Sequence, residues 1–137
     1  MSGASPSDIK DFLAGAPHAV VGASHDRAKF GNKVLRAYMR AGRPVVPVNP
    51  AGGMIEGLPA YPTLAALPGP VHGVSIVTPP PVTDRIIQEA RAVGIRRVWM
   101  QPGAESPAAI ALARASGMTV IAGGPCVLVE LGFDDHE

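Results

Sequence analysis

The alternation of two patterns constrains the fold of this chain more than any other feature of its sequence. Short, nearly continuous apolar runs alternate five times with segments suited to helices. Such an alternation is typical of a parallel sheet that helices cover on both faces, with right-handed crossovers. We therefore predict an α/β fold with a doubly wound, mainly parallel sheet of five strands, at residues 19–22, 45–48, 73–77, 97–100 and 118–122.

Local signals place the helices. A Ser-Pro pair, typical of the first turn of a helix, occurs at Ser5-Pro6 and again at Ser106-Pro107. Residues 49–72 hold five prolines and four glycines, so we expect an irregular crossover there, with one short helical turn after Thr63. Helices are predicted over residues 6–14, 33–41, 82–93 and 107–116.

Composition argues against several classes of function. The 137 residues fit a single domain, 1–137, and the formal net charge of +1 gives no global attraction to nucleic acid or to a membrane. Three Phe, two Tyr and one Trp are too few to suggest a stacking platform for single-stranded nucleic acid. No signal peptide is visible, and no apolar stretch approaches the roughly 20 residues of a membrane helix. We therefore expect a cytoplasmic protein that binds neither nucleic acid nor a membrane.

Charge is unevenly distributed along the chain. Six of the twelve basic residues fall within residues 27–43, which contain no acid, whereas residues 132–137 form an acidic tail. This acid-free segment favours binding of a phosphate. Lys33, Arg36 and Arg40 follow one another at helical spacing, so the simplest interpretation is a solvated helix face on which only Lys33 lies near enough to the helix start to contact a phosphate.

The segments that follow the strands are the places to look for a ligand. In doubly wound sheets, ligands bind outside the carboxyl ends of the strands, where the strand order reverses. The first such segment enters the amino end of a helix, where backbone N–H groups and the helix dipole favour an anion. The alternative is that Gly22 merely permits a tight turn beside solvated bases. These segments begin at Gly22, Asn49, Thr78, Gln101 and Gly123.

The first of these loops lacks the dinucleotide-binding fingerprint. GxGxxG would need a glycine in place of Ser24, and Asn49 replaces the acid that grips the adenosine ribose of NAD at the end of the second strand. Residues 47–50 instead provide a rigid apolar edge with one amide. A nucleotide other than NAD therefore fits these residues better, and coenzyme A is one that carries a diphosphate, a ribose 3′-phosphate and a long neutral arm.

Five segments carry a resemblance to a known family. They are residues 20–24 (VVGAS), 46–50 (VPVNP), Gly57 with 61–64 (YPTL), 98–103 (VWMQPG) and Cys126. Together they resemble the small single-domain CoA-binding proteins, over roughly residues 7–131. The resemblance implies a Rossmann-like CoA-binding domain, similar to the one that opens the alpha subunit of succinate–CoA ligase but standing alone.

The resemblance also implies a ligand, coenzyme A or an acyl-CoA, bound through its phosphates and adenosine. Two departures from the family affect the third strand and the cysteine. Thr78-Pro79 stands where the family often has Phe-Arg, and Gly124-Pro125 stands where a base often precedes the cysteine. The predicted ligand-binding residues are Gly22, Ala23, Ser24, Arg27, Lys29, Asn32, Lys33, Val48, Asn49, Pro50, Thr78, Pro79, Gln101, Pro102 and Gly103.

No catalytic group is recognisable in the sequence. The four histidines are scattered, without HxxxH spacing or paired carboxylates, so each is expected on the surface or in a loop. We therefore predict no enzymatic activity and no metal site. Two other functions stay open: an NAD(P)-binding oxidoreductase module and a regulatory interaction subunit. The sequence also leaves open a homodimer.

A single cysteine, Cys126, excludes an internal disulfide. It follows the fifth predicted strand through residues 123–125, and so lies near the edge where the arm of CoA would end. One interpretation is a small buried apolar residue before residues 127–129. The other is a reactive thiol that contacts the thiol end of CoA.

Overall fold

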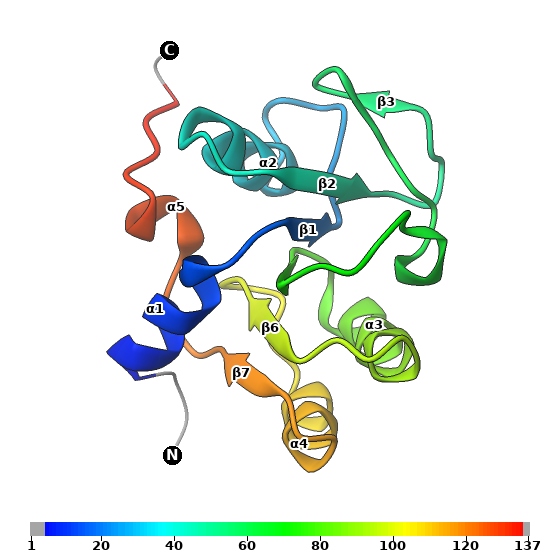
Figure 1. Cartoon of the computed structure of the whole chain (residues 1–137), viewed down its shortest axis with the longest axis vertical. Coiled ribbons are helices and arrows are strands. Elements are labelled where there is room, and N and C mark those ends of the chain that lie inside the picture. The colour runs from blue at the N-terminus through cyan, green and yellow to red at the C-terminus, as the bar shows by residue number, and fades with distance from the viewer. Residues whose placement is uncertain (1–4, 136–137) are drawn as a thin grey trace.

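The computed structural model describes residues 5–135 and confirms the α/β, Rossmann-like fold (Figure 1). The sheet is formed by β1 (His18–Val21), β2 (Val45–Val48), β5 (Gly73–Ile76), β6 (Arg97–Met100) and β7 (Thr119–Ile121). These strands lie in the order β2-β1-β5-β6-β7, and every neighbouring pair is parallel. Because the chain passes from β1 to β2 on one side and then to β5 on the other, the strand order reverses between β1 and β5.

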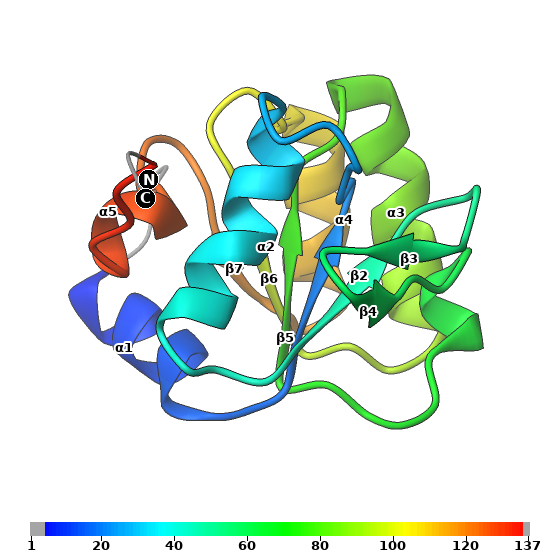
Figure 2. The same cartoon turned by 90° about the horizontal axis from the view of Figure 1, so that it is seen from above.

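Helices cover both faces of this sheet. They are α1 (Pro6–Ala14), α2 (Phe30–Arg40), α3 (Pro80–Ala92), α4 (Pro107–Ala115) and α5 (Val127–Glu130). Figure 2 shows α1, α2 and α5 on one face and α3 and α4 on the other. Within the described residues, none of the helices has both the length and the apolar character needed to cross a membrane.

The segment predicted to be an irregular crossover is more ordered than its composition indicated. It contains a hairpin formed by β3 (Met54–Ile55) and β4 (Leu58–Pro59), which pair antiparallel. The turn of this hairpin places Glu56 at φ 51°. Glutamate rarely adopts this left-handed conformation, so its presence in the sequence does not indicate such a turn. The short helical turn after Thr63 is confirmed as the 3₁₀ helix η1 (Leu64–Ala66).

Two helix predictions need correction. α2 begins at Phe30 rather than at Lys33. Phe30 lies at helical spacing to Val34, but the glycine at position 31 and an N-cap residue, Lys29, without a side-chain capping bond obscure this start in the sequence. α5 was not predicted: its apolar residues 127–129 read as a continuous run, and its N-cap residue, Cys126, makes no side-chain capping hydrogen bond.

The core consists of two apolar layers that follow the alternation of side chains along the strands. Trp99, expected in the core, is fully buried with α1 and α2, whereas its neighbour Met100 is buried on the opposite face. The indole Nε1 of Trp99 donates to the carbonyl of Pro125 (3.0 Å), which attaches the segment after β7 to the middle of the sheet. The two layers therefore hold the ends of the strands in fixed positions.

His18 departs from its expected place in a loop or on the surface. It is the first residue of β1 and is fully buried, with its ring stacked on Phe12 and Tyr38. Its Nε2 lies 2.7 Å from the carbonyl oxygen of Phe12, so this nitrogen donates and Nδ1 is left without a hydrogen-bond partner among the described residues. Burial lowers the pKa of His18 below its usual 6.5, and His72 and Arg43 lower it further, against the opposing effect of the Phe12 hydrogen bond. His136 lies outside the described residues.

His18 makes the stability of the fold depend on pH. Because its pKa is lower in the folded state, the unfolded chain binds more protons, and the free energy of unfolding falls as the pH drops below about 6.5. We expect His18→Gln, which keeps a donor for Phe12, to have a shallower dependence between pH 7 and pH 5. Denaturant titrations at several pH values measure this slope. An unchanged slope in His18→Gln, compared with His25→Gln in an exposed loop, would contradict the prediction.

Candidate functional site

The loops after the strands gather at one edge of the sheet, as the sequence predicted. Figure 2 shows the loops after β1, β6 and β7 at the same edge, above the strands in that view. The loop after β1 lies at the reversal of strand order, beside the loop after β5. This edge therefore brings together the predicted segments that begin at Gly22, Asn49 and Thr78.

Two glycines bring the start of α2 against the end of β1. Gly22 has φ 96°, and a Cβ at this position would overlap the carbonyl oxygen of Val77. A Cβ at Gly31 would overlap the carbonyl oxygen of Gly22. Gly22 was predicted from the sequence, but Gly31 was not, because its role depends on the approach of two elements rather than on a local motif.

Hydrogen bonds between residues close in sequence determine the shape of the loop from Gly22 to Lys29. The hydroxyl oxygen of Ser24 accepts from the amide of Asp26 (3.1 Å), and Asp26 Oδ1 accepts from the amide of Ala28 (3.0 Å). The Ser24 hydroxyl keeps its own proton for another acceptor. Arg27 and Lys29 are exposed, and Lys29 is the N-cap residue of α2 without a side-chain capping bond.

The side chains of two asparagines hold this loop through hydrogen bonds to its carbonyl groups. Asn49 Nδ2 donates to the carbonyl of Ala23 (2.8 Å), and Asn49 Oδ1 accepts from the amide of Ala51 (2.8 Å). Asn32, which is buried, donates to the carbonyl of Ser24 (2.7 Å). Both predicted residues thus hold the loop through its carbonyl groups.

Glu56 places a carboxylate beside residues 27–43, which contain no acidic residue of their own. From the turn of the β3–β4 hairpin, its Oε2 accepts from Asn32 Nδ2 (3.0 Å) and lies 3.3 Å from Arg27 Nε. No pattern in the sequence indicates this contact, because Glu56 is separated from Asn32 by 24 positions. The charge of Arg27 is therefore partly balanced.

Arg36 corrects the prediction of a solvated basic face. It is buried, and its guanidinium donates to Asn32 Oδ1 (2.6 Å), to the carbonyl of Arg27 (3.0 Å) and to Asp135 Oδ1 (2.6 Å). Asp135 Oδ2 also lies 3.5 Å from Lys33 Nζ. The acidic tail thus returns to the basic segment of α2, and Arg36 connects that tail to the loop.

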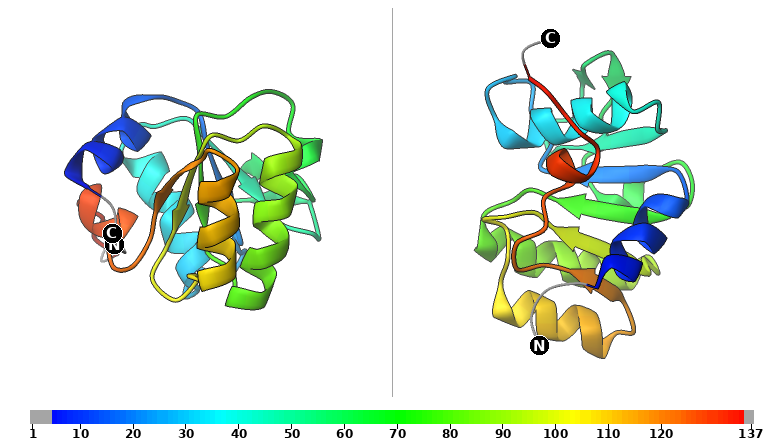
Figure 3. Two further views of the ribbon diagram at one scale, coloured as in Figure 1. Left: turned by 90° about the horizontal axis from the view of Figure 1, so that it is seen from below. Right: turned by 90° about the vertical axis from the view of Figure 1, so that its left-hand side faces the viewer.

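The C-terminal segment packs along α2. Figure 3 (right) shows it running beside this helix. The guanidinium groups of Arg36 and Arg40 lie over the ring of Phe133, 5.3 and 5.0 Å from its centroid. The hydrogen bond from Arg36 is the main cause that lowers the pKa of Asp135 below its usual value, so this carboxylate is ionised at neutral pH.

The loops after β5 and β6 complete the edge. Thr78 is half-buried and shares a hydrogen bond with Thr83 (2.8 Å between the hydroxyl oxygens), while Pro79 is exposed at the start of α3. Pro102 and Gly103 are exposed after β6. These four residues thus lie at the carboxyl edge of the sheet.

Gln101 and Cys126 lie deeper on the side of α5. The side chain of Gln101 is fully buried, and its Oε1 accepts from the amide of Val127 (2.9 Å). Its Nε2 has no hydrogen-bond partner among the described residues. Cys126 is half-buried at the start of α5. Gln101 therefore supports α5 and does not present its side chain at the surface, whereas Cys126 is partly accessible.

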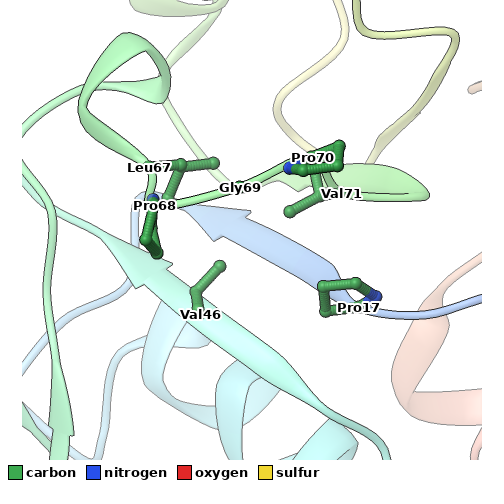
Figure 4. A pocket seen from close by; sticks show the side chains of 7 residues that line it. All are labelled: Pro17, Val46, Leu67, Pro68, Gly69, Pro70 and Val71. Atoms are coloured by element: carbon green, nitrogen blue, oxygen red, sulfur yellow. The ribbon is translucent and has the colours of Figure 1, made fainter.

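An apolar hollow lies away from this edge. It has a volume of about 260 Å³ and borders the segments that enter β1 and β5, at the amino ends of the strands (Figure 4). It offers no charged side chain that would hold a phosphate. Its lining residues are Pro17, Val46, Leu67, Pro68, Gly69, Pro70 and Val71.

Sequence comparison identifies the family. Residues 17–132 match the family model described as a CoA binding domain. The chain belongs to this CoA-binding domain family. Within residues 5–135, no group of three or more His, Cys, Asp or Glu side chains is placed to hold a metal ion.

Relatives of this CoA-binding domain include proteins of similar length. The uncharacterized protein YneT of Bacillus subtilis (strain 168) is 27% identical over 122 residues, which cover 88% of this chain and 90% of that protein. The structure of a conserved hypothetical protein from Pyrococcus furiosus superposes with a TM-score of 0.80 at 37% identity, over 85% of this chain and 99% of that one.

A larger enzyme contains a similar domain. The dinucleotide-forming acetyl-coenzyme A synthetase 1 of Candidatus Korarchaeum cryptofilum, in complex with phosphate and ADP, matches with a TM-score of 0.73 at 25% identity. The match covers 84% of this chain but 27% of that enzyme. The likeness therefore concerns one part of the synthetase.

The contact between Gly31 and Gly22 predicts the result of a small substitution. In Gly31→Ala, the added methyl group would overlap the Gly22 carbonyl oxygen, so the helix has to move away from the strand. We expect a loss of about 1–3 kcal/mol in the free energy of unfolding, as for other overpacked sites. Urea titration measures it. Gly69→Ala is the matched control because a Cβ there has open space; equal stability of the two variants would contradict the prediction.

Proposed function

We propose that this chain binds coenzyme A, free or as an acyl-CoA, with its phosphates over the loop from Gly22 to Ser24 and the start of α2. Membership of the CoA-binding domain family supports CoA as the ligand class. The observation that carries the placement is the orientation of the loop peptides.

The carbonyl groups of the loop face inward. In a trans peptide, the carbonyl of one residue and the N–H of the next point in opposite directions. Because Asn49 holds the carbonyl of Ala23 and Asn32 holds that of Ser24, the N–H groups of Ser24 and His25 point away from these side chains. Two neighbouring donors are thus presented together, an arrangement that suits a phosphate oxygen.

The start of α2 adds further donors. The amides of Phe30 and Gly31 form no hydrogen bond with another described residue, and the first turn of α2 contains no acid. The helix dipole adds a positive potential at this point. The Ser24 hydroxyl supplies a neutral donor, and Lys29 and Lys33 supply charge.

The adenosine is proposed to lie between the turns after β2 and β5. These strands flank β1 on its two sides. Val48 ends β2 and is buried in the core, Pro50 is exposed in the turn that follows, and Thr78 and Pro79 belong to the other turn. The apolar edges of Pro50 and Pro79 would enclose the base, with Val48 beneath, whereas Asn49 is already engaged in holding the loop. The arm of CoA would then extend toward Pro102 and Gly103.

Binding without turnover is the activity that we propose. Of the histidines that the structure describes, His18 is buried in the core and His25 is exposed without a side-chain partner among those residues. NAD and NADP are the competing ligands to test, although Ser24 and Asn49 stand where their fingerprint requires a glycine and an acid.

A charged substitution tests the phosphate site. Ser24→Glu places a carboxylate beside the amides that would hold the phosphate, so we expect CoA affinity to fall at least about tenfold, or roughly 1.4 kcal/mol. Isothermal titration calorimetry measures the affinity. Ser7→Glu, the same change on exposed α1, is expected to bind as the unchanged protein does. Unaltered CoA binding by Ser24→Glu would contradict the phosphate site. If ADP and dephospho-CoA do not compete with CoA, the proposed position of the adenosine is wrong.

We also propose that Cys126 lies near the thiol end of bound CoA. Its partial exposure allows reaction, in contrast to a fully buried thiol. In the proposed exchange, the Cys126 thiolate attacks one sulfur of CoA disulfide. A disulfide then joins Cys126 to one CoA, and the other CoA leaves as its thiolate.

Intact mass spectrometry tests this exchange. After incubation of the folded protein with CoA disulfide, we expect one CoA adduct, which a reductant removes and which Cys126→Ser lacks. Glutathione disulfide at the same concentration is the control, because it lacks the adenosine and phosphates that would direct CoA to the site. Equal labelling by both disulfides would show a reactive thiol that lies away from the CoA site, and no adduct at all would leave Cys126 as a packing residue only.

A further inference from the structure

Two carboxylates of the chain already contact the basic residues beside the proposed phosphate site. Glu56 lies against Arg27 and Asn32 (3.3 and 3.0 Å). Asp135 lies against Arg36 and Lys33 (2.6 and 3.5 Å). Neither acid comes from the loop or from α2, since Glu56 belongs to the β3–β4 hairpin and Asp135 to the C-terminal segment.

We propose that Glu56 and Asp135 are internal counter-anions, which the phosphates of the ligand displace from Arg27 and Lys33, and which thereby set how strongly the site prefers highly charged ligands. This inference rests on the proposed CoA site. A carboxylate and a phosphate accept from the same guanidinium and ammonium donors, so one can replace the other without a change in those donors.

The exposure of the five side chains shows which contacts can exchange. Arg27 is 59% exposed and Lys33 33%, while Asp135 is 39% and Glu56 21% exposed. Ion pairs at such exposed positions contribute little to stability, so a phosphate can compete for them. Arg36 is different: only 6% of its side chain is exposed, so its 2.6 Å hydrogen bond to Asp135 remains when a phosphate takes the place of Asp135 at Lys33.

The backbone at Glu56 indicates that its side-chain contact is built into the hairpin. It is the one non-glycine residue of the described chain with a positive φ (51°), a conformation that costs free energy for a glutamate. From this conformation its carboxylate contacts both Arg27 and Asn32. The hairpin thus places the carboxylate of Glu56 beside the basic side chain of Arg27 in the loop.

Isosteric substitutions test the proposal. Glu56→Gln and Asp135→Asn keep an acceptor oxygen but remove the charge. We expect each to raise CoA affinity roughly threefold, as one removed charge at about 8 Å would do at a high effective dielectric constant. The increase should be larger for CoA than for ADP, which lacks the ribose 3′-phosphate and its charge. Glu89→Gln is the matched control, since Glu89 accepts one hydrogen bond from Leu64 on the opposite face of the sheet.

A second measurement follows the displaced segment. If a phosphate of CoA replaces Asp135 at Lys33, the C-terminal segment loses one of its contacts with α2. The backbone amides of residues 132–135 should then exchange with deuterium faster when CoA is bound, because ligand binding and this contact are thermodynamically linked. Hydrogen–deuterium exchange with mass spectrometry detects this change in the intact chain. Slower exchange in the presence of CoA would show that the C-terminal segment closes over the ligand and would overturn the proposal.

The affinities separate this proposal from the proposed function. If the unchanged protein binds CoA but Glu56→Gln and Asp135→Asn bind it equally or more weakly, the acids support the loop and the counter-anion proposal is wrong. If CoA does not bind but inorganic pyrophosphate binds more tightly to both variants, the proposal stands and CoA is the wrong ligand. If neither ligand binds to any of the proteins, both are overturned.

Discussion

The contact between the start of α2 and the end of β1 determines the geometry of the whole carboxyl edge. Because Gly31 has no side chain, the helix comes close enough for its first turn to lie over the Gly22 carbonyl. This approach places Asn32, the next residue, within reach of the Ser24 carbonyl. One close backbone contact therefore decides both where the helix dipole points and how the loop peptides are oriented.

Arg36 extends this arrangement to the far end of the chain. A buried guanidinium is stable only when its donors are satisfied, and here Asn32, the Arg27 carbonyl and Asp135 satisfy them. The partners belong to the helix, the loop and the C-terminal segment. Arg36 thus connects three parts of the chain that are distant in sequence, and the ring of Phe133 covers it from the outside.

The sequence predicted the parts of this structure that depend on local patterns. The five strands and the helices from α1 to α4 follow from apolar spacing and capping residues, and the gathering of the loops at one edge follows from the parallel order of the strands. The sequence did not predict His18 in the core, Arg36 in a buried network or Glu56 beside the loop. Each of these depends on contacts with other segments of the chain. A basic residue at helical spacing also gives the same sequence pattern whether its side chain is solvated or buried.

Charge balance decides which interactions can give this edge its ligand preference. Arg27 faces Glu56, while Lys33 and Arg36 share Asp135, so two carboxylates balance two of these three positive charges. The loop amides and the dipole of α2 are not cancelled in this way, and they would hold the diphosphate of many nucleotides equally well. Selection among nucleotides then depends on groups outside the diphosphate. For CoA, under the function proposed above, these would be the ribose 3′-phosphate, which would compete for the paired cations, and the long arm, which would extend toward the exposed residues after β6 and the half-buried Cys126.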